Sequence, residues 1–191
     1  MDSNAPLEAE AFRRLYPWLT DWFQRPNAAL FAQRERQEIA AELGRRWGAD
    51  HPIAVLDELR GRFGTEVEAV ARTIVHENAR RDWSGIASQQ PANGIGDFIR
   101  LLWEPLRGAG FEFTYEKQGD EVRFHCTVCP HVAVARSLGA ELWMSLLLCG
   151  SDEGMVTGFN PAIGFRRTRT LMEGHACCDH AYAVLPAAAG A

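Results

Sequence analysis

The sequence predicts an α+β protein, in which N-terminal helices are followed by a ββαββ unit with a small antiparallel or mixed sheet. Up to about residue 110, apolar residues recur three and four positions apart, which is the period of an amphipathic helix. Beyond that point apolar and polar residues alternate, as in a half-buried strand. With 191 residues, of which 47% are apolar, the chain can bury one sizeable core, so we expect a single domain over residues 1–191.

The first part of this domain, residues 1–108, is expected to be helical. Breakers such as Arg25-Pro26 and Gly48 separate the periodic segments, because proline and glycine disfavour a helix interior. Gly108 and Gly110 follow the last segment, where glycine suits a left-handed cap. The predicted helices cover residues 9–23, 28–47, 52–63, 66–81 and 95–107.

The second part, residues 109–186, begins with a predicted hairpin. Residues 111–116 and 122–128 alternate in polarity on either side of the turn sequence Gln118-Gly119-Asp120. Pro130 suits the first turn of a helix, which is predicted to continue to about Leu148.

A second hairpin is predicted after this helix. Its strands are expected over residues 163–171 and 176–185, with a turn at Glu173-Gly174. If the helix crosses over between parallel strands, the third strand lies beside the second, and that turn lies at the same sheet edge as Cys129. Residues 187–191 are expected to form a disordered tail.

Cysteine and histidine gather in this part of the chain: four of the five cysteines and four of the six histidines lie in residues 124–131 and 175–180. Strand alternation places Cys178 and His180 on one face and Asp179 on the other. Cys178 and His180 are therefore predicted to lie near Cys129 and His131 at one rim of the sheet.

Two other polar residues are expected to lie outside this cluster. An unbroken helix would carry Cys149 about 27 Å from His131, at a rise of about 1.5 Å per residue. Cys149 and the nearby Asp152 are then structural residues or a second feature, provided that the helix has no break.

Composition narrows the classes of partner. A net charge of -5 and a pI near 5.7 argue against nucleic acid or an anionic membrane as the main partner. No segment has the roughly 18 uninterrupted apolar residues of a membrane span, and residues 1–6 lack the basic start of a signal peptide. We therefore expect a cytoplasmic protein, in which cysteines act as thiols, metal ligands or nucleophiles.

The clustered side chains suit two kinds of chemistry. Cys129 occupies the predicted N-cap of a helix, where free backbone N–H groups favour a thiolate, so it is the first candidate nucleophile. His131 or His180 can then act as general acid or base. Alternatively, Cys129, His131, Cys178 and His180 bind a transition metal such as zinc or manganese, with an open position for water.

Some of these residues also have a purely structural interpretation. Cys126 continues the apolar face of its strand, so we expect it to pack as a small buried hydrophobe. Arg167 and Arg169 alternate along a predicted strand, where exposed charge is common. A guanidinium clamp for a substrate carboxylate is the functional alternative for this pair.

A spaced pattern of residues in the second half resembles a known family. It comprises Cys129-Pro130-His131, Cys149 with Asp152, Pro161 and Phe165, Arg167-Thr168, Thr170-Leu171, Gly174 and Cys178-Asp179. Over roughly residues 95–185 this pattern resembles the L-2-amino-thiazoline-4-carboxylic acid hydrolase family. One departure is His180, at a position where the family pattern leads us to expect an aromatic residue.

The resemblance implies a hydrolase that opens a C=N or C–N bond of a cyclic amidine in a small ring, with a carboxylate-bearing molecule as substrate. It makes Cys129, Cys178 and Asp179 the main catalytic candidates and Arg167 a candidate for substrate binding. The cluster itself adds His131 as a catalytic candidate and His180 as a candidate for substrate binding. Cys149 becomes a motif residue without a defined role.

The ββαββ order also resembles small-molecule-binding domains related to 4-vinyl reductase, although a fold does not determine a function. This keeps a second class open, a metal- or cofactor-binding sensor or accessory domain without turnover. A third class is an interaction protein whose cysteines only pack. The sequence does not predict an oligomeric state.

Overall fold

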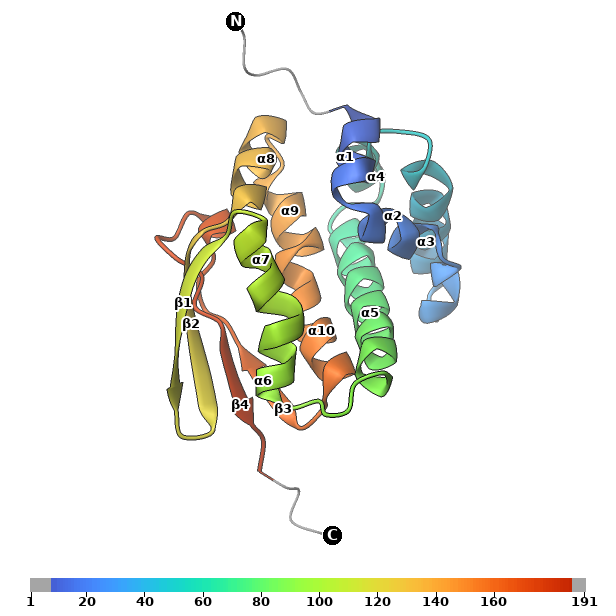
Figure 1. The fold of residues 1–191 in the computed structure, drawn as a ribbon. Helices are drawn as coiled ribbons and strands as arrows, with labels where there is room; N and C mark the ends of the chain where they lie inside the picture. The colour runs from blue at the N-terminus through green and yellow to red at the C-terminus, as the bar shows by residue number, and fades with distance from the viewer. Residues whose placement is uncertain (1–7, 187–191) are drawn as a thin grey trace, which may run out of the picture. The chain divides into compact units, whose positions relative to one another are not determined.

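The computed structural model describes residues 8–186, and it confirms the α+β class. Helices come first, and a four-stranded antiparallel sheet with further helices between its strands follows (Figure 1). Within residues 8–186 no helix combines the length and the apolar character needed to cross a membrane. The predicted tail, residues 187–191, lies outside the described residues.

The described residues divide into two compact units whose chain segments interleave. Unit 1 contains residues 8–78 and Val134–Ser151, and unit 2 contains Ala79–Ala133 and residues 152–186. The chain therefore passes between the units three times. The boundary predicted at residue 108 separates helices from strands, whereas unit 2 also includes the helices before it. A single domain over residues 1–191 stays a prediction.

Unit 1 is helical, with two differences from the predicted helices. The predicted helix over 9–23 is interrupted at Tyr16 (φ −126°, ψ 60°), because the proline at position 17 disfavours the helical conformation in the residue before it. The predicted helix over 28–47 begins only at Arg34, after Phe31 adopts an extended backbone. The elements that start within residues 8–78 of this unit are α1 (Ala9–Leu15), α2 (Pro17–Gln24), η1 (Asn27–Leu30), α3 (Arg34–Trp47), α4 (Pro52–Phe63) and α5 (Glu66–Ser88).

The sheet belongs to unit 2, and its order corrects the predicted crossover. The strands are β1 (Glu112–Gln118), β2 (Glu121–Val128), β3 (Ile163–Arg166) and β4 (Ala181–Val184), in the order β1-β2-β4-β3. The prediction placed the third strand parallel to the second and beside it. β3 does run in the same direction as β2, because both pair antiparallel with β4, but β4 lies between them. Its buried Tyr182 suits a central strand, whereas Arg166 suits the exposed edge that β3 forms.

The single helix predicted over 130–148 is also broken. Gly139 has a positive φ of 59°, a conformation that ends α8 (Pro130–Leu138) and that favours glycine. The chain then forms α9 (Glu141–Leu147), the short turn η3 (Cys149–Ser151) and α10 (Asp152–Phe159). Because of these breaks, α10 begins in unit 2 with Asp152.

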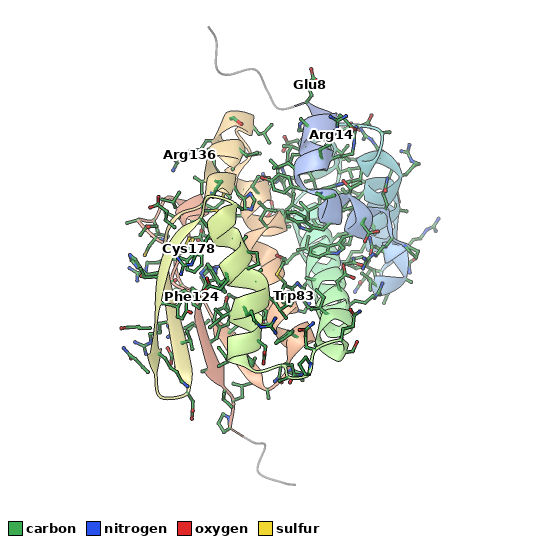
Figure 2. The ribbon with its side chains drawn as sticks, viewed as in Figure 1. Glu8, Arg14, Trp83, Phe124, Arg136 and Cys178 are labelled. Atoms are coloured by element: carbon green, nitrogen blue, oxygen red, sulfur yellow. The ribbon has the colours of Figure 1, made fainter. Side chains whose placement is uncertain are left out.

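Aromatic packing fixes the sheet of unit 2. The predicted helix over 95–107 is present as α6 (Ile95–Phe98), the π-helical segment η2 (Ile99–Trp103) and α7 (Glu104–Gly108), and it lies across one face of the sheet (Figure 1). Trp103 stacks on Phe124 with ring centroids 4.3 Å apart, and its indole N–H donates to the Tyr182 hydroxyl at 3.0 Å. Trp83 of α5 and Phe124 of β2 belong to the same core (Figure 2).

The second hairpin is shorter than predicted. The chain leaves β3 after Arg166, and the 3-10 turn η4 (Leu171–Glu173) is capped by the Thr170 side chain, which accepts the Glu173 N–H at 3.0 Å. Gly174 follows with a left-handed backbone (φ 86°), so the predicted turn at Glu173-Gly174 is present. The segment between Gly174 and β4 carries the candidate site.

Candidate functional site

Cys126 and Cys178 lie directly opposite each other where the sheet ends. They form an isolated antiparallel bridge, with the Cys126 N–H donating to the Cys178 carbonyl at 3.0 Å and the Cys178 N–H donating back at 2.9 Å. Both side chains are buried, with 2% and 7% exposure. The Cys126 thiol donates to the Val128 carbonyl oxygen at 3.4 Å. Cys126 is thus buried as predicted, but it is also the partner of Cys178.

The surroundings of the Cys178 sulfur favour its negatively charged thiolate form. The hydrogen bond from Cys126 lowers the pKa of Cys178 to about 6, against the opposing effect of burial. The Leu171 N–H, which donates to this sulfur at 3.2 Å, lowers the pKa further, as do the nearby His180 and Arg167. The same pairing, together with burial, raises the pKa of Cys126. Cys178 is therefore the thiolate of the pair and Cys126 the thiol at neutral pH.

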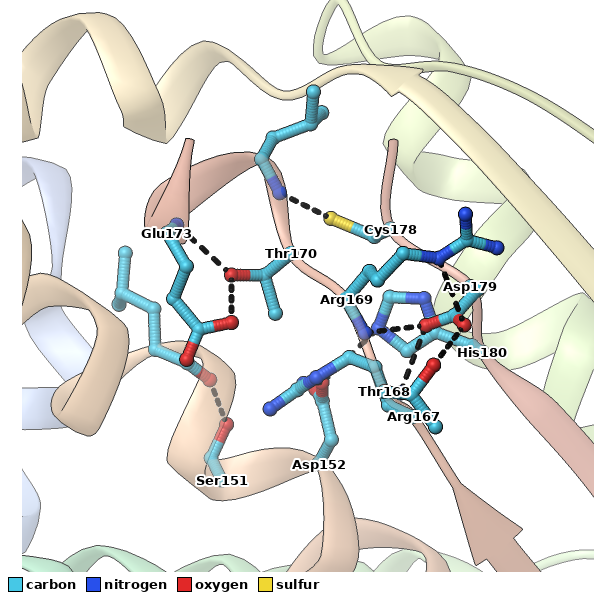
Figure 3. Close-up of polar contacts among 12 residues, drawn as sticks. Ser151, Asp152, Arg167, Thr168, Arg169, Thr170, Glu173, Cys178, Asp179 and His180 are labelled. Carbon is cyan, nitrogen blue, oxygen red and sulfur yellow. Dashed lines mark hydrogen bonds and ion pairs between the residues drawn. The ribbon is translucent and has the colours of Figure 1, made fainter. Parts of the chain in front are cut away.

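Three charged or ionisable side chains form a buried network beside this thiolate. The Nε2 atom of His180 lies 3.2 Å from Oδ2 of Asp152, and the Arg167 guanidinium forms an ion pair with the same carboxylate (Figure 3). The His180, Arg167 and Asp152 side chains are only 9%, 17% and 19% exposed. The Nδ1 atom of His180 is buried and has no hydrogen-bond partner among the described residues. It is the ring nitrogen that remains for a ligand or a reacting proton.

Asp152 was expected outside the cluster, and this expectation is wrong. It assumed one unbroken helix from Pro130, whereas the breaks after α8 and α9 allow α10 to begin at Asp152, against His180. The family pattern already contained Asp152, so the motif was a better guide than helix geometry. Cys149 belongs to unit 1, and its role stays undefined.

Asp179 faces away from this network and holds a neighbouring loop. Its Oδ1 accepts the backbone N–H groups of Thr168 at 2.8 Å and Arg169 at 2.7 Å, while its Oδ2 accepts the Thr168 hydroxyl at 2.5 Å. Burial acts to raise the pKa of Asp179, but these donors outweigh it and hold the pKa well below its ordinary value. The carboxylate thereby ties residues 167–170 to the Cys178–His180 segment.

Cys129 and His131 differ from expectation in their chemistry. Burial raises the pKa of Cys129 to about 11, and the negative charges of Cys178 and Asp152 act in the same direction. The N–H groups of His131 and Val132 favour the thiolate, as predicted for an N-cap, but their effect is smaller. The expectation of a thiolate at Cys129 is therefore wrong. The effect of burial, which raises its pKa, outweighs the effect of the N–H groups at the helix N-terminus, which lower it.

The His131 ring packs edge-on against Phe111, with centroids 5.2 Å apart, and burial lowers the pKa of His131. His131 is thus a neutral imidazole at pH 7. Its use as an acid or base stays a prediction.

The proposed metal ligands do not converge. Within residues 8–186 there is no group of three or more His, Cys, Asp or Glu side chains arranged to hold a metal ion. The Nε2 atom of His180 is engaged with Asp152, and the Cys178 sulfur is engaged with Cys126 and the Leu171 N–H. A bound zinc or manganese ion therefore stays a prediction from the sequence alone.

The fold and the site together define an α+β protein with a buried cysteine thiolate beside an aspartate–histidine pair. The family model for L-2-amino-thiazoline-4-carboxylic acid hydrolase matches residues 44–182, most of the chain. The chain belongs to this family of hydrolases. The match confirms the resemblance and extends it into the helices before residue 95. No curated protein and no solved structure matches the chain.

Proposed function

We propose that this protein hydrolyses a small cyclic amidine bearing a carboxylate, of the thiazoline carboxylic acid type, with Cys178 as the nucleophile. Membership of the hydrolase family supports the reaction class. The observation that carries the proposal is the constellation of a buried thiolate at Cys178, the His180 imidazole and the Asp152 carboxylate. A nucleophile, a base and a group that orients the base are the parts that covalent hydrolysis requires.

In the proposed first step, the Cys178 thiolate adds to the electrophilic carbon of the amidine. A carbon–sulfur bond forms, and the electron pair of the C=N bond moves to nitrogen, which takes a proton from His180. The ring then opens as the bond between this carbon and the ring nitrogen breaks. The ring nitrogen keeps the electron pair and takes a proton from the amino group on the same carbon, which becomes C=NH. Water subsequently attacks this carbon, giving one proton to the C=NH nitrogen and the other to His180, and Cys178 leaves as a thiolate as the C=O bond forms. The net change is the addition of one water molecule, and the enzyme returns to its starting state.

The other residues have supporting roles in this proposal. Asp152 binds Nε2 of His180, so it fixes the orientation of the imidazole. The positive charge of Arg167 neutralises Asp152 and attracts a substrate carboxylate toward the site. Asp179, whose oxygens are occupied by the 168–169 loop, positions Cys178 and His180 rather than reacting. Cys129 stays a candidate for contact with the substrate.

The test measures, by chromatography, how fast the wild type and matched variants consume 2-amino-thiazoline-4-carboxylate. Cys178→Ser is expected to lower kcat/KM at least roughly 10³-fold, because it removes the nucleophile. Asp152→Asn is expected to lower it roughly 10²–10⁴-fold, because His180 loses its orienting charge. Glu153→Gln, an exposed neighbour on α10, is the control and is expected to be unchanged.

Two outcomes would contradict the proposal. If Cys178→Ser kept full turnover and Cys129→Ser were inactive, the nucleophile would be Cys129 and not Cys178. Binding of this compound without any turnover by the wild type, seen as a higher melting temperature, would favour the accessory-domain alternative.

A further inference from the structure

The pairing of Cys126 with Cys178 has a geometry that suits a covalent bond. Their two mutual backbone hydrogen bonds make them a hydrogen-bonded antiparallel pair. Such pairs have Cα atoms about 5.5 Å apart, with both side chains on the same face of the sheet. A disulfide requires Cα atoms about 4.4–6.8 Å apart. The separation of the Cα atoms therefore suits a disulfide, and the two Cβ atoms need to approach from about 4.5–5.5 Å to about 3.5–4.5 Å for the bond to form.

The two cysteines lie directly opposite each other on neighbouring strands and differ in their surroundings. Their mutual backbone hydrogen bonds make them immediate neighbours, with both side chains on one face of the sheet. Cys178 is 7% exposed and Cys126 only 2%. A small oxidant consequently meets Cys178 first, and the Leu171 N–H and Arg167 favour negative charge there. Cys126 is the thiol that lies ready behind it.

We propose that Cys126 and Cys178 form a reversible oxidation site, in which a hydroperoxide oxidises Cys178 and Cys126 resolves the product as an intramolecular disulfide. The Cys178 thiolate attacks the peroxide oxygen, giving a sulfenic acid and releasing the alcohol or water derived from the peroxide. The Cys126 thiol then attacks the sulfenic sulfur, forming the disulfide and one water molecule. A dithiol reductant returns both cysteines to thiols and becomes a disulfide itself.

This site would protect a reactive sulfur. Sulfenic acids that find no second thiol are oxidised further to sulfinic acid, which is not readily reversed. An adjacent Cys126 diverts Cys178 from that route. The oxidised protein would also lack a free Cys178, and the expected loss of hydrolysis rests on the proposed function, whereas formation of the disulfide does not.

The experiment treats the reduced full-length protein with a small excess of hydrogen peroxide and maps the peptides by mass spectrometry after blocking free thiols. We expect loss of two hydrogen atoms, a cross-link between the peptides of Cys126 and Cys178, and full reversal by dithiothreitol. Alkylation of Cys178 by iodoacetamide should fall at least tenfold in the oxidised protein. In Cys126→Ala we expect oxygen addition on Cys178 in place of the cross-link.

Cys177→Ser is the matched control, because Cys177 is adjacent in sequence and also buried, yet is not the residue bridged to Cys126. It should form the same cross-link as the wild type. A cross-link from Cys178 to Cys177 or to Cys129, or a wild type whose Cys178 gains oxygen as Cys126→Ala does, would overturn the proposal. Because the readout is a mapped bond, a disulfide in a protein that fails to hydrolyse the amidine would refute only the proposed function.

Discussion

The Cys178 sulfur is the atom on which Cys126, the Leu171 N–H, His180 and Arg167 all act. We predict that its alkylation rate rises with pH around a midpoint of about 6 and is constant above it, because only the thiolate reacts and the pKa of Cys178 lies at about 6. An isolated thiol would give a midpoint of about 8.5. The measurement is the rate of iodoacetamide labelling of the Cys178 peptide between pH 5 and pH 10.

The same measurement on variants separates the causes. Cys126→Ala removes the largest contribution that lowers the pKa of Cys178, so its midpoint should move upward. Cys177→Ser should leave it unchanged. A wild-type midpoint near that of an ordinary thiol would show that the hydrogen bond from Cys126, the Leu171 N–H and the charges of His180 and Arg167 do not stabilise the thiolate.

Asp179 supports a prediction about stability. Asp179→Asn should lower the free energy of unfolding by about 1–3 kcal/mol. The amide oxygen can still accept the two backbone N–H groups, but the amide NH2 cannot accept from the Thr168 hydroxyl and the Arg169 Nε–H as Oδ2 does. The pKa of Asp179 is lower in the folded chain than its ordinary value. Its contribution is therefore complete above pH about 4, the unfolded value, and is lost as the pH falls.

Urea unfolding of the wild type and Asp179→Asn at pH 7 and pH 3 checks this prediction. The difference between the two proteins should be larger at pH 7. An equal difference at both pH values would mean that the charge of Asp179 contributes nothing and that only the shape of the side chain matters.

At the residue scale, the sequence predicted the correct neighbours on one strand but not the partners from elsewhere. Alternation placed Cys178 beside His180 correctly, because the side-chain period of a strand is fixed by its backbone. It could not reveal Asp152, since that contact depends on where a helix breaks. Nor could it give the pKa of Cys129, because desolvation depends on the packed surroundings.

At the scale of elements, the spacing of apolar residues predicted which segments are helices and which are strands. It did not predict every helix break or the order of the strands in the sheet. Gly139 and Pro17 are visible in the sequence, yet whether glycine interrupts a helix depends on the backbone conformation that the fold requires there. The direction of β3 relative to β2 was predicted correctly, but the position of β4 between these two strands was not. The buried Tyr182 favours a central place for its strand, a signal that alternation alone did not resolve.

Gly158 gives a prediction at this scale, because α10 passes close to α5 there. A Cβ at Gly158 would lie 2.1 Å from the Arg80 carbonyl oxygen, a backbone atom that cannot move aside easily. Gly158→Ala should therefore destabilise the protein by about 1–3 kcal/mol, despite the better helix propensity of alanine. Since α10 begins at Asp152, its displacement should also weaken the Asp152–His180 contact and reduce activity.

Gly85→Ala, on α5, is the matched control. Nothing lies within 4 Å of a Cβ built at Gly85, so alanine there should be neutral or stabilise by about 0.4–1 kcal/mol. Thermal unfolding of both variants provides the comparison. Equal melting temperatures for the two variants would show that α5 and α10 can separate at no cost.

At the scale of the whole molecule, the interleaving of the two units has a consequence for folding. Unit 1 includes residues 134–151, which lie between β2 and β3 in the sequence, and the buried Trp143 in that segment donates its indole N–H to Asp57 at 2.6 Å. Arg60 also lies over the same indole, 6.0 Å from its centroid. Neither unit is therefore a continuous piece of chain.

We accordingly predict that residues 1–78 alone do not fold cooperatively, because the core of unit 1 lacks Trp143 and its neighbours. Adding a peptide of residues 134–151 should increase helical circular dichroism beyond the sum of the two separate spectra. The same peptide with Trp143→Ala should do so much less, since truncating a buried tryptophan costs about 3–5 kcal/mol. Cooperative urea unfolding of residues 1–78 without the peptide would show instead that the first helices carry a sufficient core, and that residues 134–151 join a unit already formed.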